Sequence, residues 1–424
     1  MKNYKILAIN PGSASVKIAL YENEDLIFEE SIKNTMSELT DVHDLNSTIP
    51  SKIDSILLSL KNHNIELSSI DAFCGRAGGL TSLKGGVYTI NEKILEHAHD
   101  GYSMKHASNL GVQIAYELAQ KNNKPSYTVN PVTVDELQDV SRITGIKGIY
   151  KKCIFHALNQ KEVAYQYAKS INKKYEDLNL IVVHLGSGIT IGAHKKGKVV
   201  DVNNALDGDG AFTTNRTGSV TATNLIDLCF SGKYTKNELY NLVTKSGGLI
   251  SLLGTNDIRE VVSMIETGNE YAKLVLDAMI YQIGKQVGAM SINFGKDLDG
   301  IILTGAIAYS DYFVSRLKNY IDFLSEVIVI PGEKEMQALV NGTLRVLNNE
   351  EKALTYTGIP VKFRFDWNFW GSRETRFWGH VPKASLKLFC KTFGDTNQNH
   401  PNRCFWFVSP KVFPRSLFMY VMVT

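Results

Sequence analysis

The chain has 424 residues, a length that predicts two domains, each able to bury a hydrophobic core. Hydrophobic residues make up 44% and charged residues 21%, which is typical of globular proteins and argues against disordered, collagen-like and membrane classes. The formal net charge is +3, yet residues 357–424 hold ten Lys and Arg against three Asp and Glu, so the preceding part is mildly acidic. That part lacks the basic stripe expected of nucleic-acid binding.

Two further observations concern the cellular location. Residues 1–7 contain no apolar stretch of signal-peptide length, and the five cysteines have no paired spacing. These features predict a cytoplasmic protein without a zinc site or a disulfide framework.

The first elements in chain order are two β-rich runs at residues 6–10 and 16–20, which flank a polar turn and predict a hairpin. Helical patterns follow at residues 91–121 and 160–172. A second hairpin is predicted from residues 180–184 and 190–194, again around a turn of glycine and serine.

Superposing the two turns places Asn10 over His184, Gly12 over Gly186 and Ser13 over Ser187. The sequence therefore predicts two related α/β halves, at residues 1–177 and 178–350. The second half continues with a helix at 270–293, a buried strand at 300–304, a strand at 326–330 and a helix at 335–347. The inward stripe of the helix at 270–293 is expected to contain Leu274, Val275, Ala278, Met279, Ile283 and Val287. That of the last helix is expected to contain Met336, Leu339, Val340 and Leu344.

Residues 357–424 differ in composition from the rest of the chain. All four tryptophans lie there, with clustered phenylalanines and neither helical nor strand periodicity. The favoured interpretation is out-of-frame or read-through sequence, and the alternative is an added binding module.

The two turns suit phosphate binding, because glycine lets the backbone approach a ligand and backbone N–H groups can surround an anion. Neither turn has the Gly-Lys-Ser/Thr sequence of a P-loop, and neither leads directly into a helix as a dinucleotide-binding fingerprint does. A single such turn is more often a plain hairpin, whereas two matching copies favour a nucleotide held between two halves.

The motifs resemble the acetate and butyrate kinase family. The resemblance covers roughly residues 5–347. Five further segments narrow it, since their order and spacing are more similar to the butyrate kinases than to the acetate kinases: residues 74–79, 105–111, 131–136, 155–160 and 331–336. The first phosphate loop would include Asn10, Gly12, Ser13, Ser15 and Lys17. The second would include His184, Gly186, Ser187 and Gly188, and an adenosine loop would include Thr304, Gly305 and Ala306.

This resemblance implies two duplicated ribonuclease-H-like domains of the actin-like ATPase fold, with a nucleotide cleft between them. It implies the reaction butanoate + ATP = butanoyl phosphate + ADP by direct in-line transfer, with ATP/ADP and Mg²⁺ as cofactors. A homo-oligomer and metabolic coupling to a phosphotransbutyrylase are also implied, whereas composition and charge argue against nucleic-acid and membrane partners.

Chemistry and resemblance together select candidate catalytic residues. A carboxylate is already ionised at neutral pH and needs no general base, so the site must supply positive charge and alignment. By resemblance, Arg76 meets the substrate carboxylate and Arg216 meets the transferring phosphoryl group. His156 would donate a hydrogen bond to that group, and His106 would contact the acyl substrate or phosphoryl oxygens. From the residues alone, surface arginines and helix-capping histidines remain alternatives.

Asp135 is the first candidate to organise the Mg²⁺ hydration shell or to orient an arginine, and Glu335 is the second. Glu335 also fits a plain helix-terminal acid. Two rivals to the butanoate reaction stay open: an acetate, propionate or branched-chain fatty acid kinase, and a nucleotide-gated binding protein of the Hsp70 and actin type. The latter would not require Arg76, His106, His156 and Arg216 to converge.

Overall fold

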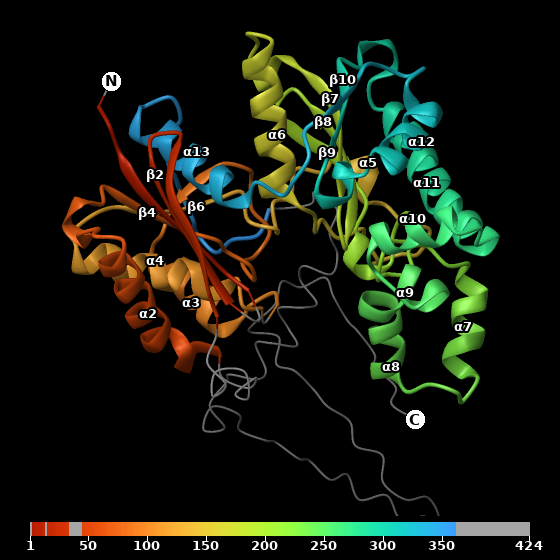
Figure 1. The fold of residues 1–424 in the computed structure, drawn as a ribbon, viewed down its shortest axis with the longest axis horizontal. Helices are drawn as coiled ribbons and strands as arrows, with labels where there is room; N and C mark the ends of the chain where they lie inside the picture. The colour runs from red at the N-terminus through yellow and green to blue at the C-terminus, as the bar shows by residue number, and fades with distance from the viewer. Residues whose placement is uncertain (1, 13–14, 34–44, 105, 362–424) are drawn as a thin grey trace, which may run out of the picture. The chain divides into compact units, whose positions relative to one another are not determined.

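The computed structural model describes residues 2–12, 15–33, 45–104 and 106–361. Two compact units divide the chain, Met1–Asp366 and Trp367–Thr424, and every described residue belongs to the first. Strands and helices alternate through that unit (Figure 1), which confirms the predicted α/β class. Residues 362–424 lie outside the described residues, and with them most of the tail for which a prediction was made.

Seven strands form the first sheet, in the order β12-β5-β6-β4-β1-β2-β3. Their bounds are β1 Lys5–Pro11, β2 Ser15–Glu22, β3 Asp25–Lys33, β4 Ala72–Gly75, β5 Val87–Thr89, β6 Ser126–Val129 and β12 Leu354–Thr355. The interior strand β1 pairs antiparallel with β2 and parallel with β4. The predicted first hairpin is confirmed, with Asn10 opposite Lys17.

Five strands form the second sheet, in the order β11-β10-β7-β8-β9. Their bounds are β7 Asn179–Leu185, β8 Ile189–Lys195, β9 Lys198–Val202, β10 Gly300–Thr304 and β11 Val327–Val329. The central β7 pairs antiparallel with β8 and parallel with β10, so the second hairpin is confirmed too. Strands β1 and β7 each pair antiparallel with the next strand in sequence and parallel with a later one, which confirms the predicted duplication.

Twelve α-helices lie in the described ranges. Their bounds are α2 Ile49–Asn62, α3 Glu92–Asp100, α4 Asn109–Lys121, α5 Asp139–Arg142, α6 Ala157–Ser170, α7 Ala222–Phe230, α8 Lys236–Asn241, α9 Gly248–Leu253, α10 Ile258–Glu266, α11 Glu270–Ser291, α12 Asp311–Ile321 and α13 Glu335–Leu347. None of these helices combines the length and apolar character required to cross a bilayer.

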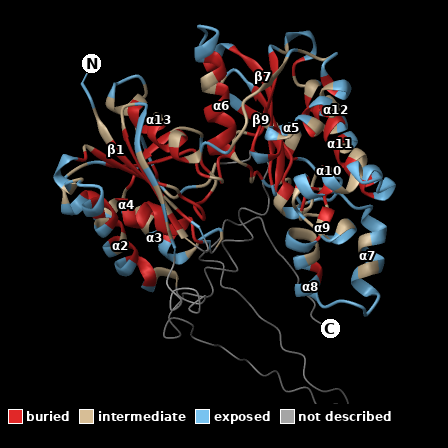
Figure 2. Cartoon of the chain, in the orientation of Figure 1, coloured by how far each residue is buried: buried red, intermediate tan, exposed pale blue. Residues whose placement is uncertain are grey.

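Each sheet is covered on both faces, because its central strands are apolar on both sides (Figure 2). In β1, Leu7 and Ile9 face a core shared with α2, α3 and α4, whereas Ile6 and Ala8 face a core shared with α13. One face of the second sheet packs on α9 to α12, and its other face packs on α6. The strand cores in Figure 2 are buried and the outer helical surfaces are exposed.

The end of the folded chain returns to the first sheet. Helix α13 packs against β1, β4 and β6, although it follows the second sheet in sequence (Figure 1). Strand β12 then adds to β5, and the buried hydroxyl of Tyr356 accepts a hydrogen bond from Thr81 N at 2.9 Å. The folded chain therefore continues beyond residue 350, and the limit at that residue stays a prediction. The boundary between 177 and 178 stays a prediction.

Two details of the helix predictions are wrong. Residues 91–121 form two helices, because Gly101 adopts a left-handed conformation at φ 60° and ends α3. In α11, Leu274 is 65% exposed, while Leu276 and Ile280 are buried in its place. The predicted inward residues of α13 are all buried, as expected.

Candidate functional site

The predicted site residues lie where parallel strands end. Asn10 is near the carboxyl end of β1, and Arg76 follows the neighbouring strand β4. In the second sheet, His184 of β7 lies beside Thr304, the last residue of β10. Carboxyl ends of adjacent parallel strands meet at one edge of a sheet, so the topology itself gathers these side chains.

Arg76 and the first turn share an acidic partner. The guanidinium donates to Glu335 Oε2 at 2.7 Å, and Asn10 Nδ2 donates to the same oxygen at 2.7 Å. The exposed fractions of the two charged side chains are 23% for Arg76 and 15% for Glu335. Glu335 therefore holds Arg76 at the mouth of the first turn, and its carboxylate is already engaged by two donors.

Within the first turn, Gly12 N donates to Ser15 O at 2.8 Å. Ser15 Oγ accepts from Ser31 Oγ at 3.0 Å, and Lys17 pairs with Glu29 at 2.8 Å. Ser13, predicted to bind phosphate, lies outside the described residues.

Arg216 lies directly against the second turn. A methyl group built on Gly188 would come within 2.3 Å of the guanidinium NH1, so only glycine leaves room for this arginine. The loop is tied to the turn by Thr213, whose hydroxyl donates to Ser187 O at 2.6 Å and accepts from Arg216 N at 3.0 Å. The buried Arg216 Nε has no hydrogen-bond partner in the described part of the chain, and burial lowers the pKa of the guanidinium.

His156 and His184 are stacked, with ring centroids 3.8 Å apart and planes at 11°. Burial is the first cause that lowers the pKa of each imidazole, to about 3 for His184 and well below the usual range for His156. The charges of both Arg76 and Arg216 add to the effect on each ring. The charges of both guanidinium groups therefore act on the stacked pair, and both rings are neutral at physiological pH.

His106 belongs to the same electrostatic environment. Its pKa is lowered first by burial and then by the charge of Arg76, whereas Glu335 opposes the shift. Its Nδ1 makes a 2.8 Å hydrogen bond with Ser108 Oγ, just before α4. The structure thus brings together four of the five predicted catalytic residues: Arg76, His106, His156 and Arg216.

Asp135 is the exception. Its two oxygens accept from Arg142 at 2.6 and 2.7 Å, and both side chains are almost fully buried. Of the two roles predicted for Asp135, binding near Mg²⁺ or orienting an arginine, its contacts agree with the second. The arginine that it orients is Arg142 and not Arg76 or Arg216. Across the described residues, no group of three His, Cys, Asp or Glu side chains is placed to hold a metal ion.

The adenosine-loop residues are held by a residue that the sequence prediction missed. Asn159 Nδ2 donates to Glu333 O at 2.7 Å and to Thr304 Oγ1 at 3.3 Å, and its Oδ1 is 2.7 Å from His184 Nδ1. Gly305, at φ 88°, exchanges backbone hydrogen bonds with Gly332 of 3.1 and 3.0 Å, and Ala306 begins a short 3₁₀ helix. The sequence signal for Asn159 is an amide side chain one turn after His156, and its burial is visible only in the structure.

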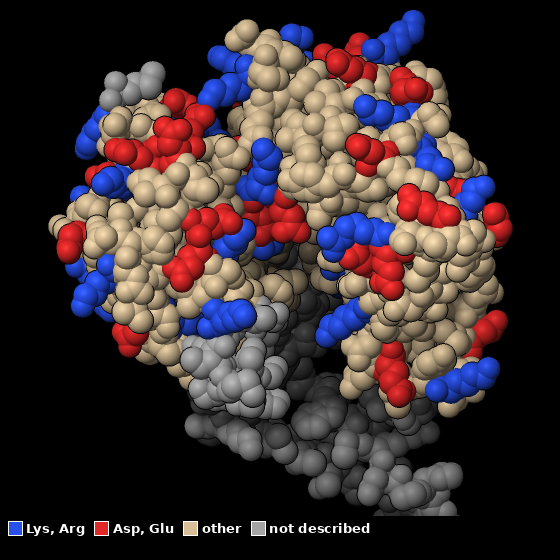
Figure 3. Space-filling view, viewed as in Figure 1, with Lys and Arg blue, Asp and Glu red and all other residues tan. Residues whose placement is uncertain are grey.

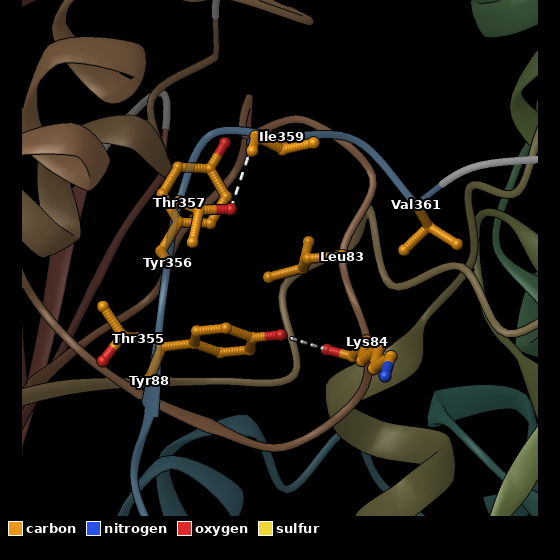
Figure 4. A pocket seen from close by; sticks show the side chains of 8 residues that line it. All are labelled: Leu83, Lys84, Tyr88, Thr355, Tyr356, Thr357, Ile359 and Val361. Carbon is orange, nitrogen blue, oxygen red and sulfur yellow. Dashed lines mark hydrogen bonds between the residues drawn. The ribbon is translucent and has the colours of Figure 1, made fainter.

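A separate pocket of about 280 Å³ is lined by Leu83, Lys84, Tyr88, Thr355, Tyr356, Thr357, Ile359 and Val361 (Figure 4). Tyr88 Oη donates to Lys84 O at 2.8 Å beside it. None of the arginine and histidine side chains described above lines this pocket, so it is not the candidate site. On the face shown in Figure 3, basic and acidic side chains are intermixed, without an extended basic area.

Acid is expected to destabilise the protein progressively as the pH falls from about 6.5 to about 3. His156, His184 and the fully buried His194 have lowered pKa values in the folded chain, so the unfolded chain binds more protons in this range. The free energy of unfolding is therefore fully retained above pH 6.5 and should fall by about 1 kcal/mol per pH unit for each histidine as the pH drops. Urea unfolding from pH 7 to 5 measures it. His184→Gln should reduce the slope, and an unchanged slope would contradict the assignment.

Comparison with known proteins completes the description of the site. The sequence model of the Acetokinase family matches residues 143–358. An acetate kinase from Porphyromonas gingivalis is similar with a TM-score of 0.70 at 20% identity, covering 81% of this chain and 100% of its own. A propionate kinase from Francisella tularensis subsp. tularensis SCHU S4 gives 0.65 at 21%, covering 80% and 98%. An acetate kinase from Entamoeba histolytica gives 0.65 at 18%, covering 80% and 99%. These likenesses confirm the predicted actin-like fold.

Proposed function

The chain belongs to the acetokinase family of carboxylate kinases, and from this premise we propose that it transfers the γ-phosphoryl group of ATP to a short-chain carboxylate, with butanoate as the leading substrate. The observation that carries the proposal is the stacked pair of neutral histidines, whose pKa values are lowered by the charges of both Arg76 and Arg216. Glu335 holds Arg76 beside Asn10 of the first turn, and Arg216 packs against Gly188 of the second. That arrangement supplies charge and alignment, which are what phosphoryl transfer to an ionised acceptor requires.

The residues present fit a triphosphate. Arg216 keeps a buried Nε without a partner in the described residues, and Gly188 leaves the space that its guanidinium occupies. Peptide N–H groups of the two turns supply further donors to anionic oxygens. When bound, ATP supplies the phosphoryl group, and the chain's part is to bind it, align it and offset its developing charge.

A protein cage for Mg²⁺ is not present in the described ranges. Asp135 is taken by Arg142, and Glu335 is taken by Arg76 and Asn10. A magnesium ion would therefore be held mainly by water and phosphate oxygens, which agrees with its preference for few protein ligands.

Each residue then has a defined task in the proposed reaction. Arg76 pairs with the substrate carboxylate, which partly replaces Glu335 as its ion-pair partner. Arg216 offsets negative charge on the equatorial phosphoryl oxygens, and the neutral imidazole of His156 donates a hydrogen bond to them. No general base is needed, because the acceptor carboxylate is already ionised at pH 7.

The choice of butanoate rests on sequence motifs, since the similar solved structures are acetate and propionate kinases. Hydroxamate trapping of acyl phosphate, with Mg²⁺-ATP and acids from acetate to valerate plus isobutyrate, tests the choice. We expect the product to peak at butanoate or isobutyrate. A peak at acetate or propionate would move the chain to those branches of the family.

The same assay should include a variant that ends at residue 361, since Val361 N still donates to Ser82 O at 3.1 Å. If only the short variant is active, residues 362–424 are what prevents activity in the full chain. If both variants fold and neither makes product, the nucleotide-gated binding alternative replaces the enzyme. Homo-oligomer formation and coupling to a phosphotransbutyrylase are parts of the same proposal.

A further inference from the structure

A chain of buried hydrogen bonds leads away from His156. Its Nδ1 lies 2.9 Å from Thr190 Oγ1, which accepts from Gln160 Nε2 at 2.8 Å. Gln160 Oε1 lies 3.0 Å from His194 Nε2, and His194 Nδ1 lies 2.7 Å from Tyr175 Oη. Each member beyond His156 is at most 2% exposed, so bulk water does not compete for these groups.

The orientation of Gln160 follows from its backbone partner. Gln160 also lies 2.9 Å from the carbonyl oxygen of Thr190, which can only accept, so the amide nitrogen must face it. The amide oxygen then faces His194 Nε2, which must carry the proton. Burial holds the pKa of His194 well below its usual range, so His194 Nδ1 is unprotonated and accepts from Tyr175.

The proton of the Thr190 hydroxyl decides the state of His156. Thr190 Oγ1 accepts from Gln160, and within the described residues its other hydrogen-bond partner is His156 Nδ1. A hydroxyl that already accepts from one group satisfies its own proton by donating to the other. Nδ1 of the neutral His156 is therefore an acceptor, and the proton of the ring is on Nε2.

The stacked partner His184 is held the opposite way. Asn159 Nδ2 faces the carbonyl oxygens of Gly332 and Glu333, which can only accept. Asn159 Oδ1 must then face His184, so His184 Nδ1 carries the proton. Since His184 is neutral, its Nε2 has a free lone pair.

We propose that Thr190, Gln160 and Asn159 are positioning residues that fix the two stacked imidazoles in opposite tautomers, His156 as a donor at Nε2 and His184 as an acceptor at Nε2. The N–H group at His156 Nε2 can donate a hydrogen bond to an anionic phosphoryl oxygen. The lone pair at His184 Nε2 repels such an oxygen, so His184 can contact phosphate only through a bridging donor such as water. This catalytic consequence rests on the proposed kinase function. The tautomers themselves do not depend on it.

The tautomers can be read directly. Two-dimensional ¹⁵N NMR of the full chain labelled at histidine, without ligands at pH 7, distinguishes protonated from unprotonated ring nitrogens. His156→Gln and His184→Gln assign the signals. We expect a proton on Nε2 of His156 and on Nδ1 of His184. Equal tautomers, or a ring protonated on both nitrogens, would overturn the proposal whether or not the protein is a kinase.

Kinetics provide the second arm. Thr190→Val keeps the shape of the side chain but removes its proton, so His156 should populate both tautomers. The kcat of Thr190→Val should fall about tenfold or more, with KM for both substrates within a factor of two of the wild-type value. The reason is that a misoriented donor affects mainly the transition state. Thr190→Ser should restore the single tautomer and the rate.

The matched control is Thr128→Val, because Thr128 is also fully buried in a strand and its hydroxyl has no partner in the described residues. It should change neither the NMR signals nor kcat. A single His156 tautomer in Thr190→Val with a wild-type rate would refute the positioning role. A wild-type chain with the expected tautomers but without kinase activity would refute only the proposed function.

Discussion

Replacing Arg216 with methionine is expected to lower kcat by about 10³-fold, because arginines that contact a transferring phosphoryl group contribute on that order. The same change is expected to raise the melting temperature. Burial lowers the pKa of this guanidinium, and its Nε lacks a partner among the described residues, so the charge is held at a cost to the fold. Methionine removes that cost, by about 1 kcal/mol, and keeps most of the side-chain volume.

Gly188→Ala is the matched control for Arg216→Met. Its methyl group would lie 2.3 Å from Arg216 NH1, the far end of a flexible side chain, so it should displace the guanidinium without unfolding the turn. We expect a reduced kcat and no gain in melting temperature, because the charge remains. Calorimetry and the acyl phosphate assay measure both quantities. A melting temperature that falls in Arg216→Met would show that the arginine stabilises the fold.

Replacing Arg76 with alanine is expected to affect stability in the opposite direction. Arg76 is paired with Glu335 at 2.7 Å, so its removal leaves a largely buried carboxylate with Asn10 as its one remaining donor among the described residues. The loss should be about 2 kcal/mol, less than for a fully buried pair because both side chains are partly exposed. KM for the carboxylate should rise on the order of a hundredfold, since the proposed partner of the substrate anion is lost.

A double-mutant cycle separates the two effects of Arg76. Glu335→Gln in the Arg76→Ala background removes the unpaired charge, so the free energy of unfolding should largely recover, whereas KM should stay high. Lys124 and Asp71, an ion pair with exposed fractions of 34% and 29%, provide the control, and Lys124→Ala should leave KM unchanged. If KM in Arg76→Ala stays near the wild-type value, Arg76 is not the carboxylate-binding residue.

Much of the fold was predictable because its signals are local. Alternation and buried runs identified both hairpins and the strand at 300–304, and the apolar stripe of 335–347 identified α13. An apolar stripe on a helix predicts which residues are buried but does not indicate which sheet they pack against. The return of α13 and β12 to the first sheet therefore could not be read from the pattern. The break at Gly101 was hidden because a glycine within a helical pattern is often tolerated.

The site was predictable where motifs carry chemistry. Arg76, His106, His156 and Arg216 share one electrostatic environment, at the carboxyl ends of parallel strands and beside the second turn, and their catalytic roles stay predictions. Asn159, Gln160 and Thr190 were missed because buried amides and hydroxyls have no spacing rule of their own. Their roles depend on partners from other elements, such as Glu333 and His194, that only the tertiary structure supplies.

The position of α13 has a consequence for synthesis on the ribosome. The first sheet begins at the amino terminus, yet Ile6 and Ala8 are covered by residues of α13 that emerge more than three hundred residues later. Contacts of such sequence separation slow folding, because a long loop must close before they form. While the nascent chain waits, one apolar face of the first sheet is open to chaperones or to aggregation, and all residues of the second sheet are synthesised before the first sheet can be completed.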